Sequence, residues 1–509
     1  ALFEIYVKNY KRIIEKADPW GLMVCYNKIN GVYGAENKYI LTDILVNQLN
    51  FTGHTVTDWG AAQRTSGASA CIKAGLSLEM PGSFILSRVY KKKKVRKALD
   101  LGKINEEELD LILKPLLRTF FRVGLFGENN IDAKEIIDNP DHQEIAQRIA
   151  EEGMVLLKNS NDFLPLDIDS INKVAILGPN ADKIFGKPYY GGSSAVVPPF
   201  EITPYEGLRK YFSKDVEIVN KPEDADFVFL FVGLDHGANF LLNFILNREG
   251  DTEGRDRKDY KLPEDQEELI KETIKKNPNT IVVLIAGSPI DVSEWYDQVP
   301  ALLNAWYPGM MGGTAIARII FGEISPSGKL PVTYPKKLED HPAHKSERRF
   351  PGDLDVKKIY FDEGIYVGYR YFDKEGIEPF FPFGFGLSYT KFELSSIRLD
   401  KNIIESENNF EVSIDIQNIG EKAGAEVIQL YIGDDESTID RPIRELQAFK
   451  KVYLNPNEKK TVSFSLDSST FEYYSEEKHK FKAEAGSFTI YIGTSSRDLP
   501  LETKIEYKS

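Results

Sequence analysis

Apolar residues in the first part of the chain follow two kinds of spacing. Segments with helical spacing alternate with short runs that are almost wholly apolar. The predicted helices cover residues 2–17, 38–49, 66–74, 84–100 and 105–122, and the predicted strands cover 21–26, 51–58 and 76–81. This alternation implies parallel strands joined by crossover helices. Three such strands cannot close a barrel by themselves, and an open parallel edge would be unprotected.

The pattern changes after a connector around residues 124–140. Short apolar runs bounded by glycine predict a buried parallel sheet. The clearest predicted strands are 173–179, 227–233 and 280–286, and helices are predicted over 141–152, 263–276 and 312–321. The middle of the chain is therefore expected to be a second α/β unit.

The last part of the chain alternates apolar and polar residues in short stretches. A segment rich in proline and aromatic residues, 350–389, precedes it. Strands are predicted over 410–416, 426–432, 460–466 and 486–493, a spacing typical of an antiparallel β-sandwich. The expected domain limits are 1–125, 146–345 and 391–509, with linkers over 126–145 and 346–390.

Composition adds limits on partners and cofactors. The chain has 509 residues and a net charge of −14, which argues against nucleic acid or an anionic membrane as a partner. Two cysteines give no disulfide framework, and the six histidines show no metal-ligand spacing with them. No apolar run reaches the ~20 residues of a membrane span. We expect no cofactor and no metal.

Localisation is expected to be cytoplasmic, because the sequence shows no signal peptide. The chain begins at Ala1 with a helix already in progress, so the true N-terminus need not be in this sequence and secretion stays open.

Asp58 is the first candidate for chemistry. It ends a predicted buried strand in the sequence Thr55-Val-Thr-Asp-Trp-Gly60. An acidic side chain at the carboxyl end of a barrel strand points into the mouth where such barrels carry out catalysis. Trp59 offers a flat apolar face that suits a sugar ring. Aspartates that cap helices are also common, so the hexapeptide alone leaves a structural role open.

A charged loop is the second candidate. Residues 248–257 read Arg-Glu-Gly-Asp-Thr-Glu-Gly-Arg-Asp-Arg and follow the predicted strand 227–233. Such a loop is often only a solvated surface. Glycoside cleavage, however, needs two carboxyl groups with different roles, which Asp58 and a loop glutamate would supply. Arg255 and Arg257 could orient or neutralise carboxylates through their forked donors.

The sequence lacks the motifs of three other enzyme classes. The strand 173–177 is followed by Gly-Pro-Asn-Ala-Asp, which is not a dinucleotide-binding Gly-x-Gly-x-x-Gly sequence. Neither a Walker A sequence nor the Gly-x-Ser-x-Gly of a serine hydrolase occurs.

Many segments together resemble glycoside hydrolase family 3 in its multidomain β-glucosidase form. They are spread over nearly the whole chain. The matching segments are Met23-Val-Cys-Tyr-Asn27, Gly53-His-Thr-Val-Thr-Asp-Trp-Gly60, Ala74-Gly-Leu-Ser-Leu-Glu-Met-Pro-Gly82, Val155-Leu-Leu-Lys-Asn159, Glu253-Gly-Arg-Asp-Arg257, Pro326-Ser-Gly-Lys-Leu-Pro331, Gly364-Ile-Tyr-Val-Gly-Tyr-Arg-Tyr371, Phe383-Gly-Phe-Gly-Leu-Ser-Tyr389, Gly424-Ala-Glu-Val-Ile-Gln-Leu-Tyr431 and Arg441-Pro-Ile-Arg-Glu-Leu446.

The resemblance implies a fold of class α/β plus all-β. Its parts are the C-terminal part of a (β/α)8-type barrel, an α/β sandwich domain and a fibronectin type III-like β-sandwich. It assigns Asp58 as the nucleophile and Glu253 as the acid/base, carried on the second domain. It places Tyr26 beside the nucleophile, and Trp59 and Met23 at the sugar site.

The acid/base assignment rests on a local pattern. Glu249 lies in the same loop, but Glu253 alone stands in the sequence Glu-Gly-x-Asp-Arg. Arg255 and Arg257 belong to that pattern and are assigned supporting roles.

One departure from the family concerns the barrel. The family's barrel begins well before the helix at Ala1, with about five strands and several residues that bind sugar hydroxyls. We therefore expect a complementary N-terminal barrel segment, either a separate chain or another part of the same polypeptide.

The expected activity is that of a retaining, exo-acting β-glycosidase acting on β-linked oligosaccharides or glycosides, above all β-glucosides. The alternatives are a β-xylosidase or β-galactosidase of the same family, or a non-catalytic carbohydrate-binding fragment.

Overall fold

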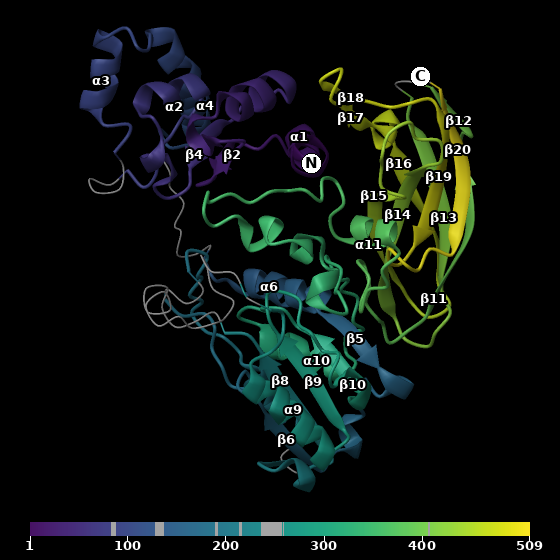
Figure 1. Cartoon of the computed structure of the whole chain (residues 1–509). Coiled ribbons are helices and arrows are strands. Elements are labelled where there is room, and N and C mark those ends of the chain that lie inside the picture. The colour runs from purple at the N-terminus through teal and green to yellow at the C-terminus, as the bar shows by residue number, and fades with distance from the viewer. Residues whose placement is uncertain are drawn as a thin grey trace. The chain divides into compact units, whose positions relative to one another are not determined.

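The computed structural model describes residues 1–82, 88–127, 137–188, 192–212, 216–235, 257, 259–405 and 408–508. The chain divides into two compact units, Ala1–Ala133 and Lys134–Ser509. Figure 1 draws the first unit in purple and blue and the second in colours from blue through teal and green to yellow. In the described residues no helix is long and apolar enough to cross a membrane.

The first unit is built on two parallel strands, β1 (Gly21–Val24) and β4 (His54–Thr57). Val24 pairs with Thr57, so both strands end at the same level. Leu78 extends the sheet through an isolated parallel bridge to Val56. Around the sheet lie a short hairpin, β2 (Lys28–Ile29) and β3 (Val32–Tyr33), the π-type helical segments Leu2–Val7 and Tyr39–Gln48, and helices α1 (Lys8–Ala17), α2 (Ala68–Ala74), α3 (Lys92–Asp100) and α4 (Glu106–Arg122).

The segment 76–91 differs from its prediction. The predicted strand 76–81 makes only the single bridge at Leu78. Of the predicted helix 84–100, residues 84–87 lie outside the described residues, residues 88–91 are not helical, and α3 spans Lys92–Asp100. Glu79 contacts the stretch just before α3: it is only 5% exposed, and its carboxylate accepts backbone N–H groups from residues 88, 89 and 90. These bonds hold residues 88–90, which are not helical, ahead of the start of α3.

The second unit begins with a six-stranded sheet in the order β5-β10-β9-β8-β6-β7. The edge strand β5 runs antiparallel to β10, and the other pairs are parallel. After β6 the chain adds β7 on one side of it and then β8, β9 and β10 on the other side. The boundary between β6 and β8 is therefore the topological switch point, where open α/β sheets bind ligands. The strands are β5 (Val155–Asn159), β6 (Lys173–Leu177), β7 (Glu217–Val219), β8 (Phe227–Gly233), β9 (Thr280–Ile285) and β10 (Ala301–Asn304).

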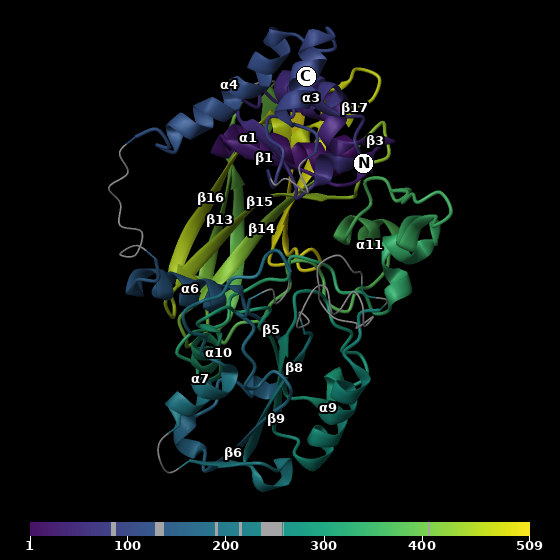
Figure 2. The same cartoon turned by 90° about the vertical axis from the view of Figure 1, so that its left-hand side faces the viewer.

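Helices cover both faces of this sheet. One core packs strand residues such as Phe229 and Phe231 against α6 (Pro140–Gly153), α7 (Pro204–Tyr211) and α10 (Gly312–Ile320). The other core packs Leu230 and Val232 against α9 (Glu264–Lys276). Figure 2 shows α9 on one side of β8 and β9, and α7 and α10 on the other. Burial on both faces explains why these strands are continuous apolar runs.

The rest of the second unit is a β-sandwich, preceded by the short helix α11 (Tyr369–Glu375). Its sheets have the orders β11-β13-β16 and β12-β20-β19-β14-β15. The core between them includes Ile414, Leu430 and Ile490. The strands are β11 (Phe392–Leu399), β12 (Ile403–Glu405), β13 (Phe410–Asn418), β14 (Gly424–Asp434), β15 (Glu445–Leu454), β16 (Lys459–Leu466), β19 (Gly486–Gly493) and β20 (Leu501–Lys508), with a small β17–β18 hairpin (Tyr473–Ser475, Lys480–Lys482).

Candidate active site

Asp58 and Tyr26 lie at the carboxyl ends of two neighbouring parallel strands. Asp58 directly follows the last residue of β4, and its backbone N–H donates to the carbonyl oxygen of Val24 at 2.9 Å. This bond continues the ladder one residue past the end of β4. The chain then turns, and the loop after β1 brings Tyr26 to the same edge. The position of Asp58 is therefore set by backbone pairing and does not depend on a long loop.

The Asp58 carboxylate is held by two hydrogen bonds. The Tyr26 hydroxyl donates to Oδ1 at 2.8 Å, and the backbone N–H of Trp59 donates to the same oxygen at 2.6 Å. The Tyr26 oxygen also lies 3.1 Å from the carbonyl oxygen of Trp59. Both bonds go to Oδ1, so within the described part of the chain Oδ2 keeps its lone pairs for an incoming group. Such an arrangement suits a carboxylate that attacks a substrate.

Three residues on or next to these strand ends carry large, exposed side chains. Tyr26 is 52% exposed and Trp59 is 58% exposed, although both are large aromatic residues. Met23, on β1, is 66% exposed. Aromatic faces beside a polar group are well suited to one face of a sugar ring, whose C–H groups are apolar and whose hydroxyls are not. The three predicted sugar-site residues thus lie at or near the carboxyl ends of β1 and β4.

The segment after Leu78 lies on the other side of β4 and makes hydrogen bonds to the residues on either side of Asp58 and Trp59. The Thr57 hydroxyl accepts the N–H of Met80 at 2.9 Å, and the N–H of Gly60 donates to the carbonyl oxygen of Met80 at the same distance. Gly60 has a φ of +83°, which lets the chain turn sharply just after Trp59. Glu79, beside Met80, is the buried carboxylate described above. Sequence reasoning missed this support, although an acid inside the apolar run Leu-Glu-Met was a visible signal.

The second predicted carboxyl group is not seen in the described residues. Glu253, the alternative Glu249, and Arg255 all lie outside them. Arg257 is described, and its guanidinium donates to the Ser288 hydroxyl at 2.9 Å and to the carbonyl oxygen of Lys261 at 2.8 Å. It therefore ties the end of the charged loop to neighbouring turns. Its predicted part in orienting carboxylates stays a prediction.

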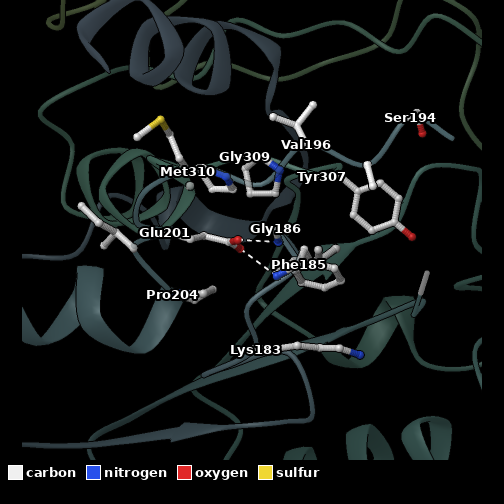
Figure 3. Close-up of a pocket in the computed structure, with 17 residues that line it drawn as sticks. Lys183, Phe185, Gly186, Ser194, Val196, Glu201, Pro204, Tyr307, Gly309 and Met310 are labelled. Carbon is white, nitrogen blue, oxygen red and sulfur yellow. Dashed lines mark hydrogen bonds between the residues drawn. The ribbon is translucent and has the colours of Figure 1, made fainter. Parts of the chain in front are cut away.

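A cavity of about 380 Å³ opens at the carboxyl end of β9 in the second unit. Figure 3 shows the Glu201 carboxylate accepting the backbone N–H groups of Phe185 and Gly186, at 3.0 and 2.7 Å. The Phe185 and Tyr307 rings lie 5.5 Å apart between centroids. The lining comes from the loop after β6, the start of α7 and the loop after β10. Sequence reasoning missed this cavity because those segments are far apart in the chain.

Family comparisons cover most of the chain with three matches. Residues 1–118 match the glycosyl hydrolase family 3 N terminal domain, and residues 154–389 match the family 3 C-terminal domain. Residues 426–496 match a fibronectin type III-like domain. The matches confirm the predicted fold class: part of a barrel, an α/β sandwich and a fibronectin type III-like sandwich.

Individual proteins with similar sequences and structures include several glucosidases. The chain is 38% identical to the thermostable beta-glucosidase B of Acetivibrio thermocellus over its whole length, and spans 66% of that protein. It is 33% identical to beta-glucosidase BoGH3A of Bacteroides ovatus and spans 71% of it. The crystal structure of a GH3 beta-glucosidase of Bifidobacterium adolescentis superposes with a TM-score of 0.86 at 32% identity, over 99% of this chain and 72% of that one.

Proposed function

The chain belongs to glycosyl hydrolase family 3, and we propose that it carries out retaining, exo-acting hydrolysis of β-glycosides, with β-glucosides as preferred substrates. The observation that carries the proposal is the Asp58 carboxylate. It lies at a strand end with Oδ1 fixed by Tyr26 and by the Trp59 N–H, next to exposed aromatic rings. The similar proteins named above are described as beta-glucosidases, which supports the choice of sugar.

The proposed reaction has two displacements. Asp58 Oδ2 attacks the anomeric carbon while Glu253 donates a proton to the glycosidic oxygen, so the C–O bond breaks and the aglycone leaves as an alcohol. Glu253, now ionised, then takes a proton from water. The water oxygen attacks the same carbon, and the bond to Asp58 breaks. Two inversions give a product with the configuration of the substrate.

The hydrogen bonds to Asp58 fit both steps. They hold the carboxylate in one orientation for attack, which lowers the entropy cost of reaching the anomeric carbon. In the second step Asp58 is the leaving group, and donors already aimed at Oδ1 stabilise the negative charge that returns to it. Tyr26 is thereby proposed as the residue that positions the nucleophile, and Trp59 as one that lines the sugar site.

We also propose that further strands complete the sheet of the first unit and bring the remaining sugar-binding residues to Asp58. Parallel sheets are normally covered on both faces, and in the described residues this sheet has only β1, β4 and the bridge at Leu78. Large apolar side chains are also exposed on the unit's helices: Tyr6, Tyr10, Ile13, Leu111, Leu117 and Phe121. Denaturing mass spectrometry of the native protein should show either a second polypeptide or one longer chain. A monomer of this chain alone, fully active, would contradict this proposal.

Nuclear magnetic resonance of the reaction tests the proposed activity. The sugar first released from an aryl β-glucoside should be the β-anomer, and mutarotation should follow later. First release of the α-anomer would contradict the double displacement. Rates on matched aryl β-glucosides, β-xylosides and β-galactosides then rank the sugars. A higher kcat/KM for xyloside or galactoside would replace glucoside as the substrate, and binding without any turnover would favour a carbohydrate-binding role.

A further inference from the structure

The Thr57 hydroxyl replaces a backbone acceptor where the parallel ladder beside β4 ends. Around Leu78 the ladder is regular: the Leu78 N–H donates to the carbonyl oxygen of Thr55, and the Thr57 N–H donates to the carbonyl oxygen of Leu78, each at 3.0 Å. A regular parallel ladder would continue with the Met80 N–H bonded to the carbonyl oxygen of Thr57. That N–H donates to the Thr57 hydroxyl instead, at 2.9 Å. The segment thus leaves the ladder at Met80 while it stays attached to Thr57.

This departure changes which N–H group the Met80 carbonyl oxygen accepts. In a regular ladder the next donor to that oxygen would be the Trp59 N–H. The observed donor is the Gly60 N–H, at 2.9 Å, so the two segments are offset by one residue. The Trp59 N–H is consequently not used by the sheet and donates to Asp58 Oδ1. One of the two hydrogen bonds that hold the Asp58 carboxylate therefore depends on this offset.

The same offset places the peptide group between Trp59 and Gly60. Its N–H is held by Met80, and its carbonyl oxygen lies 3.1 Å from the Tyr26 hydroxyl oxygen. Tyr26 has one hydroxyl proton and two acceptors in reach, Asp58 Oδ1 and this carbonyl oxygen. The charged carboxylate is the stronger acceptor, so the carbonyl serves as the alternative once Asp58 carries the sugar and has lost its charge. Both donors to Asp58 thus adjoin the peptide group that Met80 holds.

Little water reaches the Thr57 hydroxyl. Thr57 is only 2% exposed, and its hydroxyl oxygen lies 2.9 Å from the Met80 nitrogen and 3.5 Å from the Met80 carbonyl oxygen. An N–H group that loses its acceptor where water cannot replace it is unfavourable. Without the hydroxyl, Met80 would therefore move toward another acceptor. The acceptor that a regular ladder provides is the Thr57 carbonyl oxygen, and that bond would undo the offset.

We propose that Thr57 is a positioning residue for the nucleophile. Its hydroxyl holds Met80 at the offset that leaves the Trp59 N–H to Asp58 and sets a carbonyl oxygen beside the Tyr26 hydroxyl. The inference rests on the proposed role of Asp58 as the nucleophile, and Thr57 touches no substrate. Loss of the hydroxyl should shift both donors to the carboxylate. Attack is sensitive to such shifts, since an error of about 1 Å in placement can cost about a hundredfold in rate.

Thr55 supplies a matched control on the same strand. Like Thr57 it is buried, at 4% exposure, and its hydroxyl bonds the same segment: it donates to the carbonyl oxygen of Gly75 at 2.8 Å and accepts the Ser77 N–H at 3.0 Å. Both of these partners precede the offset. Thr55→Val and Thr57→Val therefore remove equivalent hydroxyls from one face of β4. The two variants should lower the urea midpoint of unfolding by similar amounts.

The two variants should differ in activity. We expect Thr57→Val to lower kcat/KM about 10- to 100-fold, by a similar factor on phenyl β-glucoside and on 2,4-dinitrophenyl β-glucoside, because the nucleophile must be in place whatever the leaving group. Thr55→Val should stay within about threefold of wild type. Thr57→Ser keeps the hydroxyl and should retain most of the activity. Thr57→Cys, whose thiol is a weak acceptor, should show the same loss at smaller size, even if Thr57→Val folds poorly.

Covalent labelling of the nucleophile measures the same step directly. A 2-deoxy-2-fluoro-β-glucoside with a dinitrophenyl leaving group should label Thr57→Val more slowly than Thr55→Val, by about the factor seen in kcat/KM. Equal labelling rates and equal kcat/KM in these two variants would overturn the inference. So would a loss confined to phenyl β-glucoside, or a Thr57→Ser variant as slow as Thr57→Val. If wild type carries the label on a residue other than Asp58, the proposed nucleophile itself is wrong. If Asp58 is labelled and Thr57→Val matches Thr55→Val, only the inference about Thr57 fails.

Discussion

Asp58 follows directly on the last residue of β4, whereas Glu253 lies within the long segment between Asp235 and Arg257. Asp58 gains its position from the sheet itself, through the bond to Val24 and the hydroxyl of Tyr26. Only residues on either side of the other segment are described: Gln266 bonds the backbone of Gly233 and Lys183 pairs with Asp235 before it, and Arg257 donates to Ser288 after it. The structure therefore shows how Asp58 is positioned, whereas Glu253 lies outside the described residues.

This difference matches what each role requires. A nucleophile must reach one carbon atom along one direction, which favours a rigid strand end. An acid/base must meet leaving groups of many shapes and can act through one water molecule, so its position can be less strict. The contrast predicts large, substrate-independent losses from changes at the Asp58 edge. Changes at the segment after β8 should instead give losses that depend on the leaving group.

The largest effect is expected for Asp58→Ala. Removing the nucleophile should lower kcat by at least about 10⁴-fold on every aryl glucoside, whatever the leaving group. Azide or formate should restore part of the activity and give an inverted product, because a small anion can occupy the space left by the carboxylate. Asp100→Ala, at the exposed end of α3, is the control and should be silent. Unchanged turnover in Asp58→Ala would end the assignment.

The next effect is expected for Glu253→Gln and depends on the substrate. Loss of the acid should slow phenyl β-glucoside by about 10²- to 10⁴-fold and spare the first step with dinitrophenyl β-glucoside, which needs little protonation. Steady-state and pre-steady-state rates on both substrates measure this. Glu249→Gln is the control in the same loop. If Glu249→Gln gave this profile and Glu253→Gln did not, the role would move to Glu249.

Tyr26→Phe should have a smaller effect at the Asp58 edge. It removes the 2.8 Å hydrogen bond to Oδ1 but leaves the bond from the Trp59 N–H. We expect kcat/KM to fall about 10- to 100-fold by a similar factor on good and poor leaving groups, since a hydrogen bond to a charged group contributes about 1.5–3 kcal/mol. Tyr33→Phe, on the neighbouring hairpin, should be nearly neutral. A loss confined to poor leaving groups would show that Tyr26 serves protonation instead.

Two carboxylates that accept backbone N–H groups, Glu79 in the first unit and Glu201 in the second, allow the stability of the two regions to be compared. Glu79→Gln keeps the shape of the side chain but replaces one acceptor oxygen by a donor, facing backbone N–H groups of residues 88–90. We expect a loss of about 1–3 kcal/mol in the free energy of unfolding, measured by urea denaturation. Glu107→Gln, exposed on α4, should change it by less than about 0.5 kcal/mol. If Glu79→Gln were as stable as wild type, Glu79 would not stabilise the segment beside Asp58.

The smallest effect is expected for Glu201→Gln in the second unit. Among the described residues its carboxylate accepts two backbone N–H groups, those of Phe185 and Gly186, and it is less buried than Glu79. A loss of about 1 kcal/mol or less is expected, because solvent replaces part of what is lost. A larger loss of unfolding free energy than for Glu79→Gln would mean that the cavity region depends more on the Glu201 carboxylate than the Asp58 region depends on Glu79.

The sequence predicts the Asp58 edge well because its signals are local. An apolar strand, an acid at its end and an aromatic neighbour stand within a few residues of one another. The role of Glu79 is not predictable in this way, since its carboxylate accepts N–H groups that lie 9 to 11 residues further along the chain. The two hydrogen bonds to the backbone of Gly233 come from Gln266, and nothing near Gly233 in the sequence indicates them.

The same reasoning applies to the fold. Long apolar runs such as β8 and β9 were predictable because both faces of the sheet are covered. The short strands β7 and β10 were missed, because three or four residues carry too little pattern to distinguish a strand from a turn. In the sandwich, β15 was missed because its residues are mostly half-exposed, so its alternation is weak.

Trapping the glycosyl-enzyme tests the central claim most directly. A 2-deoxy-2-fluoro-β-glucoside with an activated leaving group slows both steps but slows the second more, so the covalent intermediate accumulates. Mass spectrometry of the digested protein should find one sugar on the peptide that contains Asp58, and Asp58→Ala should carry none. A label on another carboxylate, or complete inactivation without any covalent sugar, would contradict the assignment of Asp58 as the nucleophile.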